Sequence, residues 1–133
     1  MQKSIQVIAA AALALTVATA VQAQQRQWVK IAATNSGDQV FFDTASQIRV
    51  FDAGIKQNTF TTLTLATEGR KSFRQRYQAD CFKGTLALRE LRWINAQGDV
   101  IREVTLDSAD QKPIVPAKDT IALDIWRYAC AQF

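Results

Sequence analysis

The most regular alternation of apolar and polar side chains in this sequence lies in residues 72–81. Successive side chains of a β-strand point to opposite faces, so a period of two is typical of a strand with one buried face. Gln75 is the one polar residue on the apolar side and weakens the pattern slightly. The apolar side carries Phe73, Tyr77, Ala79 and Cys81, and the polar side carries Arg74, Arg76, Gln78 and Asp80. The stretch is therefore predicted to form a half-buried strand.

Short apolar segments separated by turn residues predict further strands. β-Branched residues favour strands, and residues 58–66 hold four threonines. Residues 43–46 are predicted to form a turn, because Asp and Ser side chains can bond nearby backbone amides. Loops are predicted for residues 34–38 and 107–118. The other predicted strands are residues 27–33, 39–42, 48–51, 86–94 and 100–106. Six or seven short strands in sequence suggest an antiparallel meander.

The C-terminal segment has apolar residues at a helical period. Asp119 or Thr120 can cap a helix there, because each side-chain oxygen can accept a bond from a free amide of the first turn. A helix with one apolar face needs a sheet on which to pack. We therefore expect an α+β fold: an antiparallel β-meander sheet of about six strands with one C-terminal helix packed on it. The stripe consists of Ile121, Ile125, Trp126, Ala129, Cys130 and Phe133, with Leu123 outside it.

Residues 1–23 have the pattern of a secretory signal peptide. Lys3 precedes an apolar run over residues 7–18, and small or short residues follow up to Ala23, as in an A-x-A-like cleavage site. The run is shorter than the roughly 20 residues that span a bilayer. We expect cleavage after Ala23, export to the periplasm, the cell surface or the medium, and no stable membrane insertion. No cysteine stands at the expected cleavage point, so no lipid anchor is expected.

The size of the remaining chain favours one domain, residues 24–133. Without Lys3 it carries 15 Lys and Arg against 12 Asp and Glu. This mild excess permits contact with anionic glycans, lipids or acidic proteins without requiring it. Export argues against nucleic acid as a partner. We expect a monomer or a weak homodimer.

The chain contains no histidine. This excludes Ser-His-Asp and Cys-His nucleophilic sites and the usual His-rich zinc sites. A hydrolase with paired carboxylates stays open as an alternative, but the acids are scattered and form no recognisable motif. Asp107, Ser108, Ala109 and Asp110 lack the alternating acids and the glycine of a calcium loop and are interpreted as a polar loop. We expect no catalytic site, metal or cofactor.

The two cysteines, Cys81 and Cys130, are interpreted as a disulfide, because an even pair in an exported protein is usually oxidised. A free reactive thiol or a metal-binding pair is the alternative. A disulfide here would tie the C-terminal helix to the central strands of the sheet.

A basic run is the clearest candidate for partner binding: Arg70, Lys71, Arg74 and Arg76. Arg74 and Arg76 share one strand face, and Arg89, Arg92 and Arg102 could extend the patch if their strands are neighbours. Such a patch would attract sulfated glycans or acidic protein loops. The alternative is a solvated face, in which Asp80, Glu90 and Glu103 act as cross-strand partners.

The three tryptophans, Trp28, Trp93 and Trp126, could form an aromatic binding platform or belong to the core. Aromatic rings carry much of the buried area of a small domain. Trp126 also lies on the helical stripe, which favours the core.

Several landmarks together resemble the surface-adhesin protein E domain family of Gram-negative bacteria. They are Trp28-Val29-Lys30, Val40-Phe41-Phe42-Asp43, Ser46-Gln47-Ile48, Arg76-Tyr77-Gln78-Ala79-Asp80-Cys81, Gly98-Asp99-Val100-Ile101, Val115-Pro116 and Trp126-Arg127-Tyr128-Ala129-Cys130. The resemblance covers nearly all of residues 24–133. It implies a small antiparallel sheet, a C-terminal helix and a disulfide. The best-known member of that family is a surface adhesin that binds host matrix and serum proteins and can dimerise.

The sequence thus favours a non-enzymatic exported binding domain that contacts host matrix proteins or anionic glycans. The alternative is a soluble periplasmic envelope protein with a structural or stress-related role and no host ligand. The absence of a lipid-attachment cysteine favours this alternative.

Overall fold

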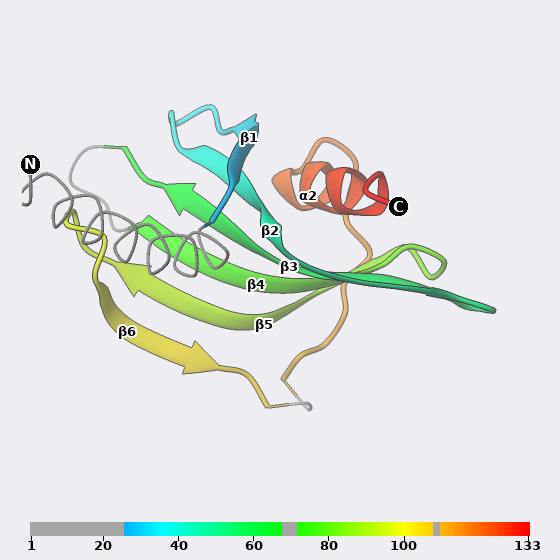
Figure 1. The fold of residues 1–133 in the computed structure, drawn as a ribbon. Helices are drawn as coiled ribbons and strands as arrows, with labels where there is room; N and C mark the ends of the chain where they lie inside the picture. Colours follow the sequence, from blue (N-terminus) through cyan, green and yellow to red (C-terminus); the bar gives the residue numbers. More distant parts are fainter. Residues whose placement is uncertain (1–25, 68–71, 108–109) are drawn as a thin grey trace, which may run out of the picture.

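The computed structural model describes residues 26–67, 72–107 and 110–133. The predicted signal peptide lies outside these residues. Six strands form one antiparallel sheet in which neighbours in sequence are neighbours in space, and a single described helix packs on it (Figure 1). The elements are β1 (Trp28–Ala33), β2 (Gln39–Asp52), β3 (Ile55–Leu65), β4 (Ser72–Asp80), β5 (Thr85–Ile94), β6 (Val100–Thr105) and α2 (Ile121–Cys130). The expected α+β meander with a C-terminal helix is therefore confirmed.

The turn predicted for residues 43–46 is wrong, because β2 runs through it without a break. The pairing of β2 with β3 shifts register between Asp43 and Ile48 instead. Polar side chains replace the ladder bonds there. Asp43 accepts a hydrogen bond from the Ala45 amide at 3.0 Å. Ser46 Oγ donates to the Asp43 carbonyl and accepts from the Thr61 amide, both at 2.7 Å. The local bonding expected of Asp and Ser thus produces a bulge that keeps the strand in the sheet.

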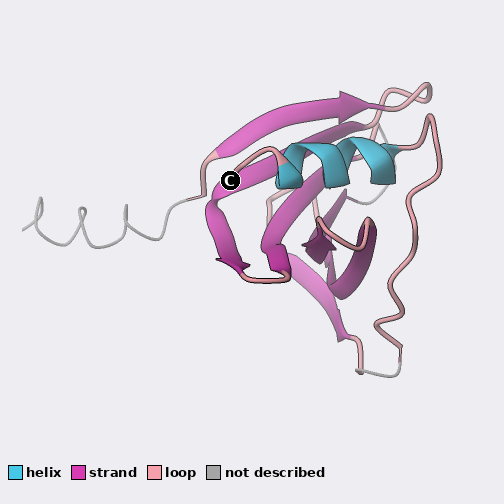
Figure 2. Ribbon diagram, turned by 90° about the vertical axis from the view of Figure 1, so that its right-hand side faces the viewer, coloured by secondary structure: helices cyan, strands magenta, loops and turns pink. Residues whose placement is uncertain are grey.

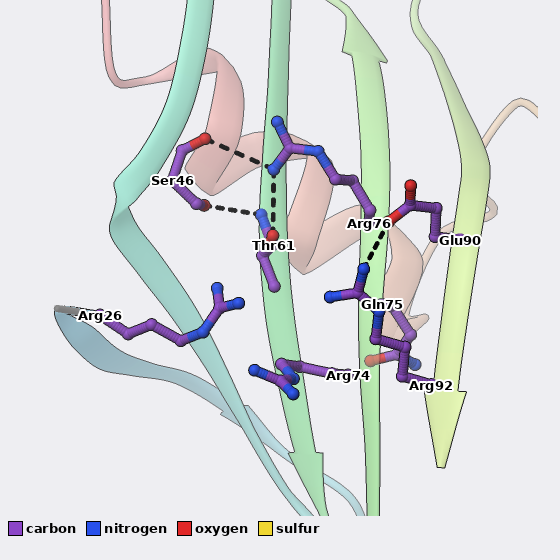
Figure 3. Close-up of a pocket in the computed structure, with 8 residues that line it drawn as sticks. All are labelled: Arg26, Ser46, Thr61, Arg74, Gln75, Arg76, Glu90 and Arg92. Carbon is purple, nitrogen blue, oxygen red and sulfur yellow. Dashed lines mark hydrogen bonds and ion pairs between the residues drawn. The ribbon is translucent and has the colours of Figure 1, made fainter. Parts of the chain in front are cut away.

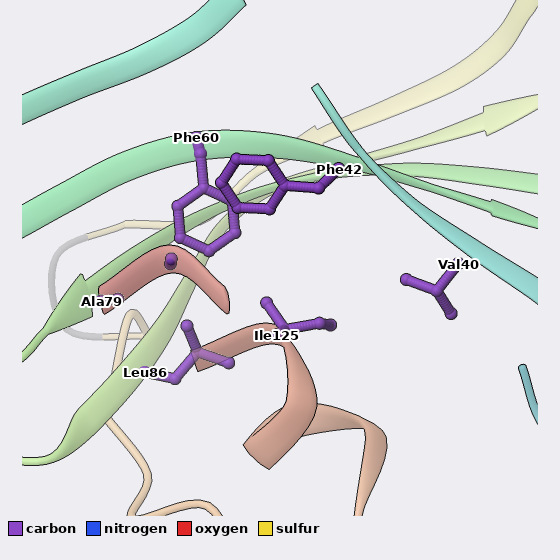
Figure 4. Packing of buried hydrophobic residues seen from close by; sticks show 7 residues of the cluster. Val40, Phe42, Phe60, Ala79, Leu86 and Ile125 are labelled. Atoms are coloured by element: carbon purple, nitrogen blue, oxygen red, sulfur yellow. The ribbon is translucent and has the colours of Figure 1, made fainter. Parts of the chain in front are cut away.

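One face of the sheet is apolar and carries the core. Phe42 of β2 and Phe60 of β3 are fully buried, and their rings stack with centroids 4.6 Å apart. Tyr128 of α2 meets the Phe42 ring edge-on at 4.7 Å. Figure 2 shows α2 lying against this face of the curved sheet, and Figure 4 shows the Phe42 and Phe60 rings side by side above Ile125 of the helix. The buried cluster consists of Val40, Phe42, Phe60, Ala79, Leu86, Ile125 and Ala129.

The C-terminal end of α2 is fastened to the sheet by polar and covalent links. The expected Cys81–Cys130 disulfide is present and joins the β4–β5 turn to the last residue of α2. Asn58 is fully buried, and its Nδ2 donates to the Ala129 carbonyl at 3.0 Å and to Gln47 Oε1 at 2.8 Å. These links hold the C-terminal end of α2 against β3 and the β4–β5 turn.

Thr120, one of the two predicted caps, is the N-cap of α2. Its Oγ1 accepts a hydrogen bond from the Leu123 amide at 3.3 Å. We expect Thr120→Ala to lower the free energy of unfolding by about 1 kcal/mol, because this amide loses its acceptor. Urea denaturation measures the change. Thr120→Ser keeps the oxygen and serves as the control; an equal loss in both variants would contradict a capping role.

Candidate functional site

A hollow of about 320 Å³ lies on the face of the sheet away from α2. In Figure 3 its side chains stand in front of the strands, while α2 lies behind them. Four of the eight lining residues are arginines, and they come from the segment before β1 and from β4 and β5. The lining residues are Arg26, Ser46, Thr61, Arg74, Gln75, Arg76, Glu90 and Arg92.

The register of the sheet brings the strand arginines together. Arg74 and Arg76 are two residues apart on β4, so their side chains point to the same face. Arg92 of β5 is the direct cross-strand neighbour of Arg74, and Glu90 is that of Arg76. Directly opposed residues lie about 5 Å apart at Cβ, so the three guanidinium groups share one small region. The buried apolar face beneath them fixes this register, because a slip by one residue would bury the arginines.

Arg26 reaches the hollow from the chain just before β1. Its Nη1 donates to Asp43 Oδ2 at 3.0 Å. Asp43 is only 1% exposed, and its Oδ1 also accepts the Gln27 amide at 2.8 Å. The buried Asp43 carboxylate therefore neutralises the charge of Arg26 and holds its side chain at the edge of the hollow.

The carboxylates beside the hollow are concentrated on one arginine. Arg92 pairs with Glu103 at 3.1 Å and with Glu90 at 3.6 Å. Arg76 has neutral partners instead: its Nη1 donates to Thr61 Oγ1 at 3.0 Å and, at 3.5 Å, to the Ser46 carbonyl. Burial lowers the pKa of Arg76, while the charge of Glu90 acts in the opposite direction.

Arg74 has the least compensated charge in the cluster. Within the described residues it forms no ion pair, and its Nε is buried without a hydrogen-bond partner, as is that of Arg92. Burial lowers the pKa of Arg74, and the positive charges of Arg26 and Arg92 lower it further, while the negative charge of Glu103 acts in the opposite direction. Arginine nevertheless stays protonated in proteins. The guanidinium of Arg74 is therefore charged, partly desolvated and repelled by its neighbours, a state that a bound anion would relieve.

The structure unites only part of the predicted basic patch. Arg74, Arg76 and Arg92 line the hollow, whereas Arg70 and Lys71 lie outside the described residues. Arg89 binds Gln78 Oε1 at 3.1 Å and does not line the hollow. Arg102 lies 4.8 Å from the centroid of the Trp93 ring, and Trp93 is paired with Phe73 of the apolar face. The extension toward Arg102 is thus wrong, because that side chain is on the other face.

Sequence reasoning missed Arg26. It stands just before the first strand, and nothing in the local pattern links it to the arginines of β4 and β5. Its one sequence signal is the polar Asp43 at the end of an otherwise apolar segment, which needs a cationic partner when it is buried.

The predicted cross-strand acids have divided roles. Glu90 and Glu103 pair with Arg92, as the alternative of a solvated face expects. Asp80 instead accepts the Lys83 amide at 2.9 Å in the β4–β5 turn, together with a bond from Gln57. The acids therefore compensate Arg92 and leave Arg74 and Arg76 without a carboxylate partner among the described residues.

The three tryptophans do not form a common platform. Trp126 packs against the core, and its Nε1 donates to the Asp80 carbonyl at 3.2 Å. Trp93 meets Phe73 edge-on. Trp28 lies at the rim of the open face, 5.7 Å from the guanidinium carbon of Arg26. The core role expected of Trp126 is confirmed.

No protein-family model, curated protein or solved structure matches the chain. Within residues 26–67, 72–107 and 110–133, no group of three or more Cys, Asp or Glu side chains is placed to hold a metal ion. No helix of the same residues is long and apolar enough to cross a membrane.

Proposed function

We propose that this protein is a non-enzymatic, exported binding domain of the surface-adhesin protein E type, which recognises anionic groups on a glycan. The observation that carries the proposal is the charge of Arg74, which has no ion-pair partner among the described residues and lies in a hollow with three other arginines. Guanidinium groups present planar pairs of donors that match sulfate and carboxylate oxygens.

The charge balance of the hollow supports an anionic ligand. Asp43 is buried beneath Arg26 and is not available at the surface, and both glutamates lie against Arg92. Arg74 and Arg76 therefore face the hollow with neutral partners or none. A sulfate or carboxylate placed between them would gain charge-assisted hydrogen bonds without first breaking an ion pair.

A place outside the cytoplasm is part of the proposal. The signal-peptide pattern and the disulfide support export, because disulfides persist in oxidising compartments. Proteolysis of intact cells tests surface display. Protein that is found only in the periplasm would favour an envelope role without a host ligand over adhesion.

Binding to immobilised heparin by surface plasmon resonance tests the proposal. We expect saturable binding that weakens with added salt, since exposed charge interactions are screened. Arg74→Ala should weaken it about five- to tenfold, as expected for loss of a charged hydrogen-bonding group. Arg127→Ala removes the same charge from an exposed position on α2 and is the matched control. Folded protein without saturable binding, or equal losses in both variants, would refute the arginine hollow as the glycan site.

A further inference from the structure

A second hollow, of about 280 Å³, adjoins the arginine hollow on the same face. The two share Arg26 and Arg74 as a common wall. The apolar side chains that line the second hollow include Trp28, Leu63, Leu65 and Ile94, and Ser72 and Asn95 lie beside them. On one side of Arg74 the surface is therefore strongly cationic, and on the other side apolar side chains such as Leu63, Leu65 and Ile94 lie beside polar ones such as Ser72 and Asn95.

The register of the sheet places these apolar side chains on the open face. Leu63 is the cross-strand neighbour of Arg74, and Leu65 lies two residues further along β3. Trp28 pairs with Asp43 of β2 and is stacked by Arg26. Leu65 is 41% exposed although it stands on a strand inside the sheet. An apolar side chain in a hollow exposes surface that a ligand could cover.

We propose that the two hollows together bind a monomeric anionic amphiphile: a compact phosphate or sulfate head in the arginine hollow and a single alkyl chain in the apolar one. This inference rests on the proposed function, since it assigns the head of the ligand to the same arginines. A fully polar glycan would leave Leu63 and Leu65 uncovered. A neutral lipid would leave Arg74 unpaired. An anionic amphiphile would pair with the charge of Arg74 and would also cover Leu63 and Leu65.

Calorimetric titration of the purified protein with n-butyl, n-hexyl and n-octyl phosphate, each below its micelle-forming concentration, tests the inference. Burial of each additional methylene should raise the affinity about threefold until the apolar hollow is filled. Inorganic phosphate provides the head without a tail, and octyl glucoside provides a tail with a neutral head. We expect both to bind at least tenfold more weakly than octyl phosphate.

Two variants on β3 locate the tail. Leu65→Ser should weaken the binding of octyl phosphate about fivefold, because less apolar surface covers the tail, and should leave the binding of inorganic phosphate and heparin unchanged. Ile55→Ser is the matched control, because Ile55 is 44% exposed at the opposite end of the same strand. Affinity that does not depend on chain length, while heparin still binds, would overturn the inference and leave the proposed function standing. Failure of both heparin and phosphate would refute the proposed function itself.

Binding to phosphatidylglycerol vesicles tests whether the protein recognises a charged membrane surface and not a single amphiphile molecule. We expect Leu65→Ser to change the binding of octyl phosphate and not the binding of vesicles. Strong vesicle binding combined with no measurable binding of alkyl phosphates would overturn the inference in favour of surface electrostatics.

Discussion

Replacing both cysteines, Cys81→Ser with Cys130→Ser, is expected to lower the free energy of unfolding by about 2–4 kcal/mol. The disulfide joins residues 49 positions apart, and closing a loop of that length removes conformational entropy worth about 4 kcal/mol from the unfolded chain. For a domain of this size the loss corresponds to a fall in melting temperature of roughly 10–15 °C. Calorimetry of the wild type and the double variant measures it.

Reduction of the wild-type disulfide tests whether the loss of stability comes from opening the loop or from the substituted side chains. Reducing the wild-type protein should destabilise it as much as the double substitution does, because both open the same loop. The helix should remain in the folded state, since the Asn58 side chain still binds the Ala129 carbonyl and Ile125 is still buried. A double variant that melts at the wild-type temperature would show that the cross-link does not stabilise the fold.

Asp43→Ala is expected to cost about 2–3 kcal/mol of stability. The carboxylate accepts the Gln27 and Ala45 amides and the Arg26 guanidinium, so its removal leaves two backbone donors without their acceptor and an arginine without its counter-charge. Arg26 is one-third exposed and can be rehydrated, which keeps the cost below that of a fully buried pair. Chemical denaturation measures the loss.

Asp43→Asn is the informative control. Asparagine keeps a carbonyl oxygen for the two amides but lacks the charge that holds Arg26. We therefore expect a smaller loss of stability than with alanine. Heparin should bind the Asn variant at least as tightly as the wild type, because Arg26 is then released from its internal partner. Equal destabilisation by Asn and Ala would mean that the stability comes from the ion pair with Arg26 and not from the hydrogen bonds that the two backbone amides donate.

Much of the architecture follows from local patterns. The alternation around Arg74 and Arg76 gives the orientation of β4 correctly, with Ala79 fully buried and the arginines on the open face. The helical stripe predicts that Ile125 and Ala129 face the sheet, and both are buried. These features depend only on the periods of strands and helices, which are properties of the local sequence.

The bulge and the complete arginine cluster do not follow from local patterns. Asp and Ser at residues 43–46 make the same short-range bonds in a turn and in a bulge. The bulge forms because Ser46 Oγ accepts a hydrogen bond from the amide of Thr61, which lies on the next strand. Likewise, only the pairing of β1 with β2 carries Arg26 to the arginines of β4 and β5. Both outcomes depend on register between strands, which no single segment encodes.

The strictly sequential order of the six strands keeps the entropic cost of forming the sheet low. Each strand pairs with the strand that follows it in sequence, so every pairing closes a short connection and carries a small entropic cost. Docking of α2 is different, because it brings the end of the chain back to β1. Cys130 lies on that last element, so we expect native cross-linking to follow collapse of the strands. An enzyme that forms the disulfide would then act on a chain whose sheet has already assembled.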